Sequence, residues 1–181
     1  MQKSHNSLKI VVVTTQEQLM HALFIRSICF MEEEHLKISH AFDGNDFQAT
    51  HMVAYDCDEP IGATRIRWFK DFAKIERTAF RPAFRNARTL KTLSEFVFAH
   101  VARKGYSRLI THAGPRYVPL WRRVLGFEVV EGKPPLVSPD YEDCVELVKE
   151  LVVPHNAISQ HSDVGTLYRV EGAWDTPTWL G

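Results

Sequence analysis

Ala73-Lys74-Ile75-Glu76-Arg77-Thr78-Ala79-Phe80-Arg81-Pro82 combines a strand-like run, residues 73–80, with a proline just after it. After Pro82 the apolar residues recur at helical spacing. That helical stripe consists of Leu90, Leu93, Val97 and Val101. A basic last turn and the C-terminal glycine Gly105 follow. The sequence therefore predicts a strand, a loop and an amphipathic helix in direct succession.

Two further strand-like runs precede this unit, at residues 51–55 and 61–69. The segment 56–60 between them is polar and ends in a proline, which is typical of a hairpin connection. Upstream of the hairpin, residues 42–46 are rich in Asp, Asn and Gly. Such residues favour turns, so we expect a loop there.

The amino-terminal part of the chain predicts a strand followed by a helix. Residues 10–13 are β-branched, and helical periodicity extends over residues 16–34. Thr15 and Gln18 have the spacing of a capping box at the start of this helix. Three glutamates, residues 32–34, crowd its far end, where the helix dipole disfavours negative charge.

The remaining periodic segments are strands and one short helix. A strand is expected at residues 107–113 and a helix at residues 117–125, which Gly126 ends. Strands follow at residues 127–130 and 141–151. This order of elements predicts an α/β (α+β) architecture, in which helices flank a mixed sheet.

The length of 181 residues suits one domain with a single core, which we assign to residues 8–151. Residues 152–181 lack clear periodicity but contain Trp174 and Trp179. Aromatic residues so near a chain end are rarely left in water. We therefore expect a C-terminal arm that packs on the domain, on the second protomer of a homodimer or over a pocket.

Basic residues are concentrated in the middle of the chain. Residues 65–123 contain fifteen Lys and Arg but only three acids, although the whole chain has 22 residues of each sign. Such asymmetry indicates that one face meets an anion, which would be a phosphorylated cofactor, an acidic protein or nucleic acid. We do not expect nucleic acid, because the basic residues lack the interleaved aromatic residues that stack on bases.

The cysteines and the apolar runs indicate a cytoplasmic protein. Cys29, Cys57 and Cys144 are too few and too scattered for a disulfide framework or a paired-cysteine metal site. The nine histidines show no ligand spacing, so we expect no metal. No apolar run approaches a signal sequence or the roughly 20 residues of a membrane span, so we expect no membrane association.

Several segments together resemble the GNAT superfamily of acyltransferases, over roughly residues 8–151. They are the run at 74–82, the turn and helix start at 85–90, Gly105, and Val124-Leu125-Gly126-Phe127. The resemblance implies a mixed, mostly antiparallel central sheet of about six to seven strands, flanked by about three to four helices. It also implies that the strand at residues 73–80 parts from its neighbour and binds the pantetheine arm of acetyl-CoA or acyl-CoA through free backbone N–H groups.

The same resemblance implies which residues bind the donor. They are Thr78, Ala79, Phe80, Arg85, Asn86, Arg88 and Thr89. In the family, the loop and helix start hold the coenzyme A pyrophosphate on exposed amides. The glycines usual there are replaced by Asn86, Arg88 and Leu90, which restricts how closely the backbone approaches a phosphate. Alternatively, Arg85 and Arg88 belong to a solvated basic face.

A second departure concerns the leaving thiolate. In the family, a tyrosine on the short helix often protonates it. Alignment on Gly126 and Phe127 places Arg122 at that position, and Tyr117 lies more than one turn away. Arg122 would then stabilise the thiolate electrostatically, or it is a surface residue of an amphipathic helix.

Within the superfamily, the chain resembles the acyl-homoserine-lactone (autoinducer) synthases, which take acyl chains from an acyl carrier protein. The resemblance rests on Arg26, Phe30, Glu33, Asp43, Asp46, Arg65, Glu76 and Arg77. It implies that Arg26, Asp43, Asp46 and Arg65 shape the amine-substrate site, where the aspartates would bind a cationic amine. Alternatively, the aspartates serve as turn formers around Gly44. The aromatic residue that this group carries after the first helix is missing here.

Glu76 is our candidate catalytic base. Acyl transfer requires a neutral amine and an acceptor for its proton. With the two-residue period of a strand, Glu76 shares a face with Lys74 and Thr78. Alternatively, Glu76 makes a structural ion pair with Arg65 or Arg67 across the sheet.

We therefore predict an N-acyltransferase that moves an acetyl or longer acyl group from a pantetheine thioester to a small amine by direct attack. Acyl-CoA is the expected donor. One alternative is an autoinducer-synthase-like enzyme whose basic face docks an acidic acyl carrier protein. The other is a non-catalytic module of the same fold that binds acyl groups or coenzyme A.

Overall fold

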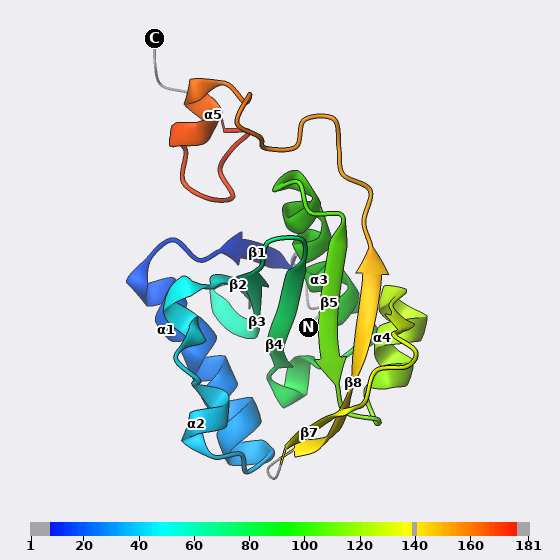
Figure 1. Cartoon of the computed structure of the whole chain (residues 1–181). Helices are drawn as coiled ribbons and strands as arrows, with labels where there is room; N and C mark the ends of the chain where they lie inside the picture. The colour runs from blue at the N-terminus through cyan, green and yellow to red at the C-terminus, as the bar shows by residue number, and fades with distance from the viewer. Residues whose placement is uncertain (1–7, 139–140, 177–181) are drawn as a thin grey trace.

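The computed structural model describes residues 8–138 and 141–176, and a twisted sheet forms its centre (Figure 1). Within these residues the strands follow the order β1-β2-β3-β4-β5-β8-β6, and β7 pairs with β8. Their bounds are Lys9–Val12 (β1), Thr50–Asp56 (β2), Glu59–Trp68 (β3), Ala73–Phe80 (β4), Arg108–Ala113 (β5), Glu128–Val129 (β6), Leu136–Ser138 (β7) and Tyr141–Glu150 (β8). All pairings are antiparallel except that of β4 with β5. The predicted mixed, mostly antiparallel sheet is confirmed.

Helices flank this sheet on both faces. In the described residues the α-helices are Gln16–Arg26 (α1), Ile38–Ala41 (α2), Ala87–Arg103 (α3), Val118–Leu125 (α4) and Val164–Tyr168 (α5). A π-helical segment, Ser27–Glu33 (η1), continues α1, and 3₁₀ turns lie at Asn45–Gln48 (η2) and Pro82–Phe84 (η3). None of the helices in this part of the chain has the length and apolar character to cross a membrane.

Two hydrophobic clusters occupy the two faces of the sheet. On β2, Met52 and Ala54 belong to the cluster that includes α3 and α4, whereas Val53 and Tyr55 belong to the cluster beneath α1. Successive side chains of a strand point to opposite faces, so both faces of β2 are buried. Figure 1 shows α1 and α3 on opposite sides of the sheet.

The first helix begins as its sequence predicts but ends in a different geometry. Thr15 Oγ1 accepts a hydrogen bond from Gln18 N at 3.2 Å, and Gln18 Oε1 accepts one from Thr14 N at 2.8 Å. The second bond reaches one residue further back than in a standard capping box. The predicted helix over residues 16–34 is present, but from Ser27 onward it has π-helical hydrogen bonding.

The helix after Pro82 matches its prediction closely. Leu93, Val97 and Val101 are fully buried against the sheet. Asn86 caps its start by accepting a hydrogen bond from Thr89 N at 3.0 Å. Gly105 follows its end with a φ of 88°, a conformation that glycine adopts without a steric cost.

Five short elements were not predicted: α2, η2, η3, β7 and α5. Each contains five residues or fewer, which is too short to show a hydrophobic period. Tertiary contacts therefore decide their conformation; β7, for example, forms against β8.

The segment after β8 contacts the domain through Glu171. Its Oε1 atom lies 2.9 Å from each of His100 Nε2, Lys104 Nζ and Thr50 Oγ1. Trp174 stacks on His100 with ring centroids 4.9 Å apart. Trp179 lies outside the described residues, and the division into domain 8–151 and arm 152–181 stays a prediction.

We expect acid to weaken this attachment. Burial raises the pKa of Glu171, but hydrogen bonds from His100 and Lys104 lower that pKa further, to about 2 from an ordinary 4.5. The stability that Glu171 contributes is thus present above pH 4.5 and is lost as the pH falls toward 2. Glu171→Gln should cost about 1–2 kcal/mol in the free energy of unfolding at pH 7 and much less at pH 3.

Urea unfolding at both pH values measures this difference. Glu95→Gln, on the exposed side of α3, is the matched control and should change stability little at either pH. An equal cost of Glu171→Gln at pH 7 and pH 3 would contradict the prediction.

Candidate active site

The candidate site opens where β4 parts from β5. Backbone pairing joins the two strands only at Ala73 with Leu109 and at Lys74 with Ile110. Beyond these pairs, Thr111 Oγ1 donates to the carbonyl oxygen of Ile75 at 3.0 Å. No register pair links residues 76–80 to β5, so the predicted parting of the strands is confirmed.

A β-bulge in β4 lies at the same point. Ala63 pairs with Ala79 and Arg65 with Glu76, so two residues of β4 face one residue of β3. Arg77 lies in this bulge with a φ of 53°, which is uncommon for a residue other than glycine. Bulges bend and twist the strand that carries them. This bend accounts for β4 leaving β5 while it keeps its pairing with β3.

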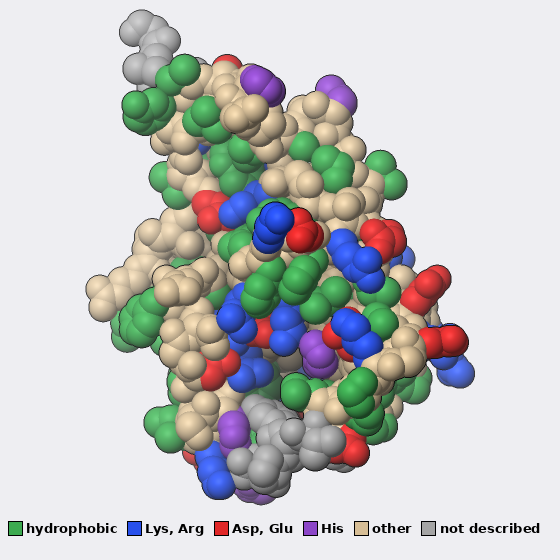
Figure 2. All heavy atoms as spheres, viewed as in Figure 1, with side chains coloured by type: hydrophobic (Ala, Val, Ile, Leu, Met, Phe, Trp, Pro, Cys, Tyr) green, Lys and Arg blue, Asp and Glu red, His purple; other side chains and the backbone are tan. Residues whose placement is uncertain are grey.

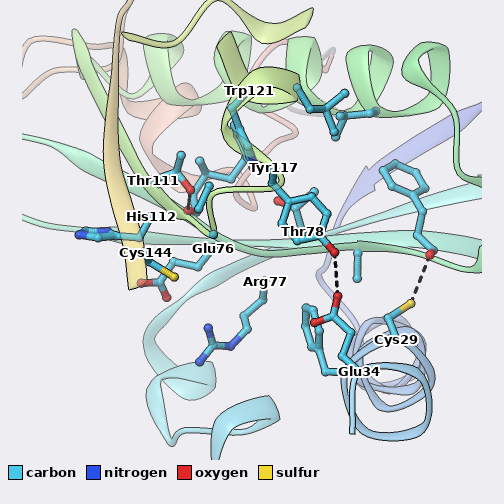
Figure 3. A pocket seen from close by; sticks show the side chains of 18 of the residues that line it. Cys29, Glu34, Glu76, Arg77, Thr78, Thr111, His112, Tyr117, Trp121 and Cys144 are labelled. Atoms are coloured by element: carbon cyan, nitrogen blue, oxygen red, sulfur yellow. Dashed lines mark hydrogen bonds between the residues drawn. The ribbon is translucent and has the colours of Figure 1, made fainter. Parts of the chain in front are cut away.

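The space between the parted strands is a cleft of about 680 Å³ (Figure 3). Its walls come from η1, β4, β5, the start of α3 and α4. Of the residues implied for donor binding, those that line the cleft are Thr78, Ala79, Phe80, Arg85 and Asn86. Arg88 is exposed and does not line it, and Thr89 Oγ1 donates to the carbonyl oxygen of Phe84 at 2.8 Å. Their roles in donor binding stay predictions.

Acids at the end of the first helix reach across the cleft. The guanidinium of Arg85 forms a two-pronged ion pair with Glu33, and its Nε donates to the carbonyl oxygen of Phe80 at 2.7 Å. The Arg85 guanidinium lowers the pKa of Glu33. Glu34 accepts a hydrogen bond from the Tyr117 hydroxyl at 2.9 Å (Figure 3) and a second one from Arg116 at 3.3 Å. These partners explain why acids stand where the helix dipole disfavours them.

Tyr117 is a cleft residue that sequence reasoning missed. It precedes α4 and lines the cleft, whereas Arg122 is exposed and does not line it. Burial, followed by the bond to Glu34, raises the pKa of Tyr117, so its hydroxyl is protonated at neutral pH. The signal in the sequence was its place directly after the Gly114-Pro115 break that ends β5.

The predicted acceptor residues form one charged network. The buried Arg65 guanidinium lies 2.7 Å from Asp43, 2.9 Å from Asp46 and 2.5 Å from Glu76. Arg26, also buried, lies 2.5 Å from Asp46. Asp43 and Glu76 line the cleft, and Arg26, Asp46 and Arg65 lie behind its wall. The structure thus brings all these residues together, and their role toward a substrate stays a prediction.

Glu76 both faces the cleft, as a candidate base must, and forms ion pairs across the sheet, which was the alternative interpretation. Its carboxylate faces the cleft and forms ion pairs with Arg65, with Lys74 at 2.7 Å and with Arg67 at 3.8 Å. Burial raises the pKa of Glu76, but Lys74 and Arg65 lower that pKa further, so it stays below 4.5. The carboxylate is therefore ionised at neutral pH, as a base must be.

His112 is a second residue whose place only the structure shows. From β5 it lines the cleft, and its Nε2 lies 3.5 Å from Glu146 Oε2. Burial and the nearby Lys74 lower the pKa of His112 below 6.5, so the imidazole is neutral at pH 7. Across the described residues, no group of three or more His, Cys, Asp or Glu side chains could hold a metal ion.

Two curated relatives of this chain are named as acetyltransferases, and no family model matches the chain. The N-acetyltransferase YjcF of Bacillus subtilis, itself uncharacterized, is 27% identical over 126 residues, which are 70% of this chain and 89% of YjcF. A second Bacillus subtilis protein, assigned as an acetyltransferase, is 30% identical over 102 residues, which are 54% of this chain and 69% of that protein.

Solved structures share the fold at lower identity. A Lactobacillus plantarum protein assigned to the N-acetyltransferases has a TM-score of 0.73 at 22% identity, covering 81% of this chain and all of that one. A GNAT family acetyltransferase from Elizabethkingia anophelis, with acetyl-CoA bound, has a TM-score of 0.61 at 17% identity and covers 82% and 100%. FeeM, an N-acyl amino acid synthase from uncultured soil microbes, has a TM-score of 0.67 at 12% identity and covers 80% and 90%.

The parted strands, the cleft between them and these relatives define an acyltransferase. The chain belongs to the GNAT superfamily. Its mixed sheet with flanking helices is the fold of that superfamily.

We expect Arg65 to be essential for stability, because it is shared by three carboxylates. Arg65→Ala leaves Asp43, Asp46 and Glu76 crowded without their common cation, which should cost about 3–5 kcal/mol in the free energy of unfolding at pH 7. Arg67→Ala removes a partly exposed arginine 3.8 Å from Glu76 and should cost less than about 1 kcal/mol. Urea denaturation measures both, and equal costs would show that Arg65 is not the central cation.

Proposed function

We propose that this protein transfers an acyl group from acyl-CoA to a small amine by direct attack of the amine on the thioester. The observation that carries the proposal is the separation of β4 from β5 over residues 76–80, which leaves one side of β4 without a strand partner. Backbone N–H groups there are available to a pantetheine arm and to the thioester oxygen. A covalent enzyme intermediate is not required.

The donor end of the cleft lies between the end of β4 and the start of α3. Thr78, Ala79 and Phe80 would line the pantetheine arm, and Arg85 and Asn86 stand at the helix start. The amides at the amino end of a helix, together with exposed Arg88, favour phosphate groups. A fold neighbour that holds acetyl-CoA supports this choice of donor.

Two cleft residues, Glu76 and Tyr117, would carry out the proton transfers that the reaction needs. As the amine nitrogen bonds to the thioester carbon, the C–S bond breaks and the nitrogen must lose a proton. Ionised Glu76 would accept that proton, and Asp43 would share the acceptor wall, held in place by Arg26, Asp46 and Arg65 behind it. Tyr117, whose raised pKa keeps its hydroxyl protonated, would give its proton to the leaving thiolate.

An acyl carrier protein is the alternative donor, and the ion pairs argue for acyl-CoA instead. Eleven of the fifteen basic residues between 65 and 123 form ion pairs with described acids of this chain. The basic segment is thus largely neutralised within the molecule.

The presence of both Glu76 and Tyr117 in the cleft favours catalysis over a binding module. Within the described residues the three cysteines form no disulfide, which fits the reducing cytoplasm, where we place the reaction.

Acetyl-CoA binding tests the donor. Titration calorimetry should show saturable binding, and Arg88→Ala should weaken it about fivefold because one phosphate contact is lost. Arg123→Ala, an exposed arginine of α4, is the control and should bind as the wild type does. Absence of binding to acetyl-CoA and to longer acyl-CoA would refute the proposal of an acyl-CoA donor.

Glu76→Gln tests the base. The amide is isosteric but cannot accept the proton, so kcat should fall about 100-fold or more, while the Kd for acetyl-CoA stays within about twofold. Initial rates with a panel of amines and calorimetry with acetyl-CoA give the two numbers. An unchanged kcat would exclude Glu76 as base, and Glu95→Gln is the control for loss of a carboxylate elsewhere.

A further inference from the structure

The charged end of the cleft, around Glu76, contains more positive than negative charge. What we infer from this charge about the acceptor rests on the proposed function. The cations of the network are Arg26, Arg65, Arg67, Lys74 and Arg77. The carboxylates that face them are Asp43, Asp46 and Glu76. With these groups ionised, two positive charges have no carboxylate partner of their own within the described residues.

Neighbouring groups leave this surplus unchanged. Glu146 lies 2.6 Å from Lys133, and the pair adds no net charge. His112, the next titratable group on the wall, has a lowered pKa and is neutral at pH 7. Space-filling Figure 2 shows Lys and Arg side chains gathered in the hollow at the centre of this face, around a few acids.

The surplus lies on the side of the network that faces the cleft. Arg26 and Arg65 are 1% and 0% exposed, and they form ion pairs with Asp43, Asp46 and Glu76. Arg67, Lys74 and Arg77 line the cleft with side chains that are 31%, 20% and 23% exposed. A ligand in the cleft therefore meets the three cations that share only two carboxylates, Asp43 and Glu76.

Arg77 is the cleft cation that lies in the bulge of β4, and it shares its carboxylate partner with Arg65. Its one ion pair is with Asp43 at 3.1 Å, and Asp43 is already bound by Arg65 through two hydrogen bonds. Its Nε is buried without a hydrogen-bond partner, as are the Nε atoms of Arg26 and Arg65. Its left-handed backbone conformation in the bulge is costly, and such strain persists where a side chain must be aimed. Figure 3 shows Arg77, Glu76 and His112 on the opposite side of the cleft from Glu34 and Tyr117.

The two aspartates are poorly placed to bind a cationic amine. Asp46 is held by Arg26 and Arg65, and Asp43 by Arg65 and Arg77. A ligand with a positive charge and no negative group would enter a positive field. An anionic group on the ligand would instead offset the surplus and find planar guanidinium donors.

We propose that the acceptor is an amino acid or a closely related amine, whose carboxylate is bound by Arg77, Arg67 and Lys74 while its nitrogen faces Glu76. The carboxylate supplies the negative charge that the acceptor end lacks. The nitrogen, one carbon away from the carboxylate, then lies between the cations and the thioester. Specificity for a carboxylate is set by Arg77 first, because its side chain lines the cleft and its described carboxylate partner, Asp43, is already bound by Arg65.

Acyl transfer to paired acceptors tests this inference. The common amino acids are compared with their own amides, using acetyl-CoA and a long-chain acyl-CoA as donors. The wild type should prefer the best amino acid over its amide by about tenfold or more in kcat/KM, since a charged contact is lost in the amide. Arg77→Gln should raise KM for the amino acid about tenfold with kcat nearly unchanged, and should leave KM for the amide unaltered.

Arg67→Gln is the second variant and should act in the same direction, which guards against misfolding of Arg77→Gln. Arg123→Gln, outside the cleft, is the matched control and should keep wild-type KM values. Equal use of amino acids and amides, or a loss in Arg77→Gln that is the same for both, would overturn the inference while the proposed acyltransfer stands.

Absence of transfer to any acceptor would instead refute the proposed function. In that case calorimetry with the amino acids on coenzyme A-bound protein decides the inference separately. Binding that weakens in Arg77→Gln supports the carboxylate site, and no binding of any amino acid overturns it.

Discussion

The partial pairing of β4 is the constraint on which the rest of the molecule depends. β3 pairs with β4 along its length, but β5 pairs with it at only two positions. The bulge at Arg77 allows β4 to stay paired with β3 and yet separate from β5, because the extra residue bends β4 away from β5. The cleft begins at this bend, and the loop after β4 leads directly into the amino end of α3. The same backbone feature thus creates the space, frees one side of a strand and aims Arg77 at the cleft.

The charge distribution of the chain is used largely inside the molecule. The basic middle segment folds against the acidic flanks, as in the pairs of Arg85 with Glu33 and Lys104 with Glu171. Arg65 is the extreme case, since it is fully buried and shared by three carboxylates. A buried cation is stable only when such partners offset the loss of hydration. The network fixes η2, β3 and β4 relative to one another and so fixes the acceptor wall.

The cleft has two ends of different chemistry. Near α3 and α4 its lining includes Phe80, Leu90 and Trp121, together with the Glu34–Tyr117 hydrogen bond. Near the start of β4 it is charged, with Glu76 and its cations. The proposed reaction between an acyl thioester and a small polar amine matches this division, because each partner needs a different environment. The bulge in β4 lies between the two ends, where the reacting atoms would meet.

The sequence by itself determined the regular elements that carry strong periodicity. The bounds of β4, the buried stripe of α3 and the β2–β3 hairpin all follow from local pattern, because helices and strands expose their period in the order of side chains. The sequence also placed Glu76, Asp43 and Asp46 together in one predicted acceptor site. Short elements such as α2 and β7 have no period to show and could not be predicted.

Only the tertiary structure decided which charged groups face the cleft. Arg77 lines the cleft, whereas Asp46 and Arg65 lie behind its wall. In the sequence all three are simply charged residues in strands or next to turns. Tyr117 and Glu34 meet across the cleft from distant parts of the chain. Such partnerships depend on how far β4 bends from β5 and where the end of the first helix comes to lie. Those are properties of packing between remote segments, which a local pattern of residues does not contain.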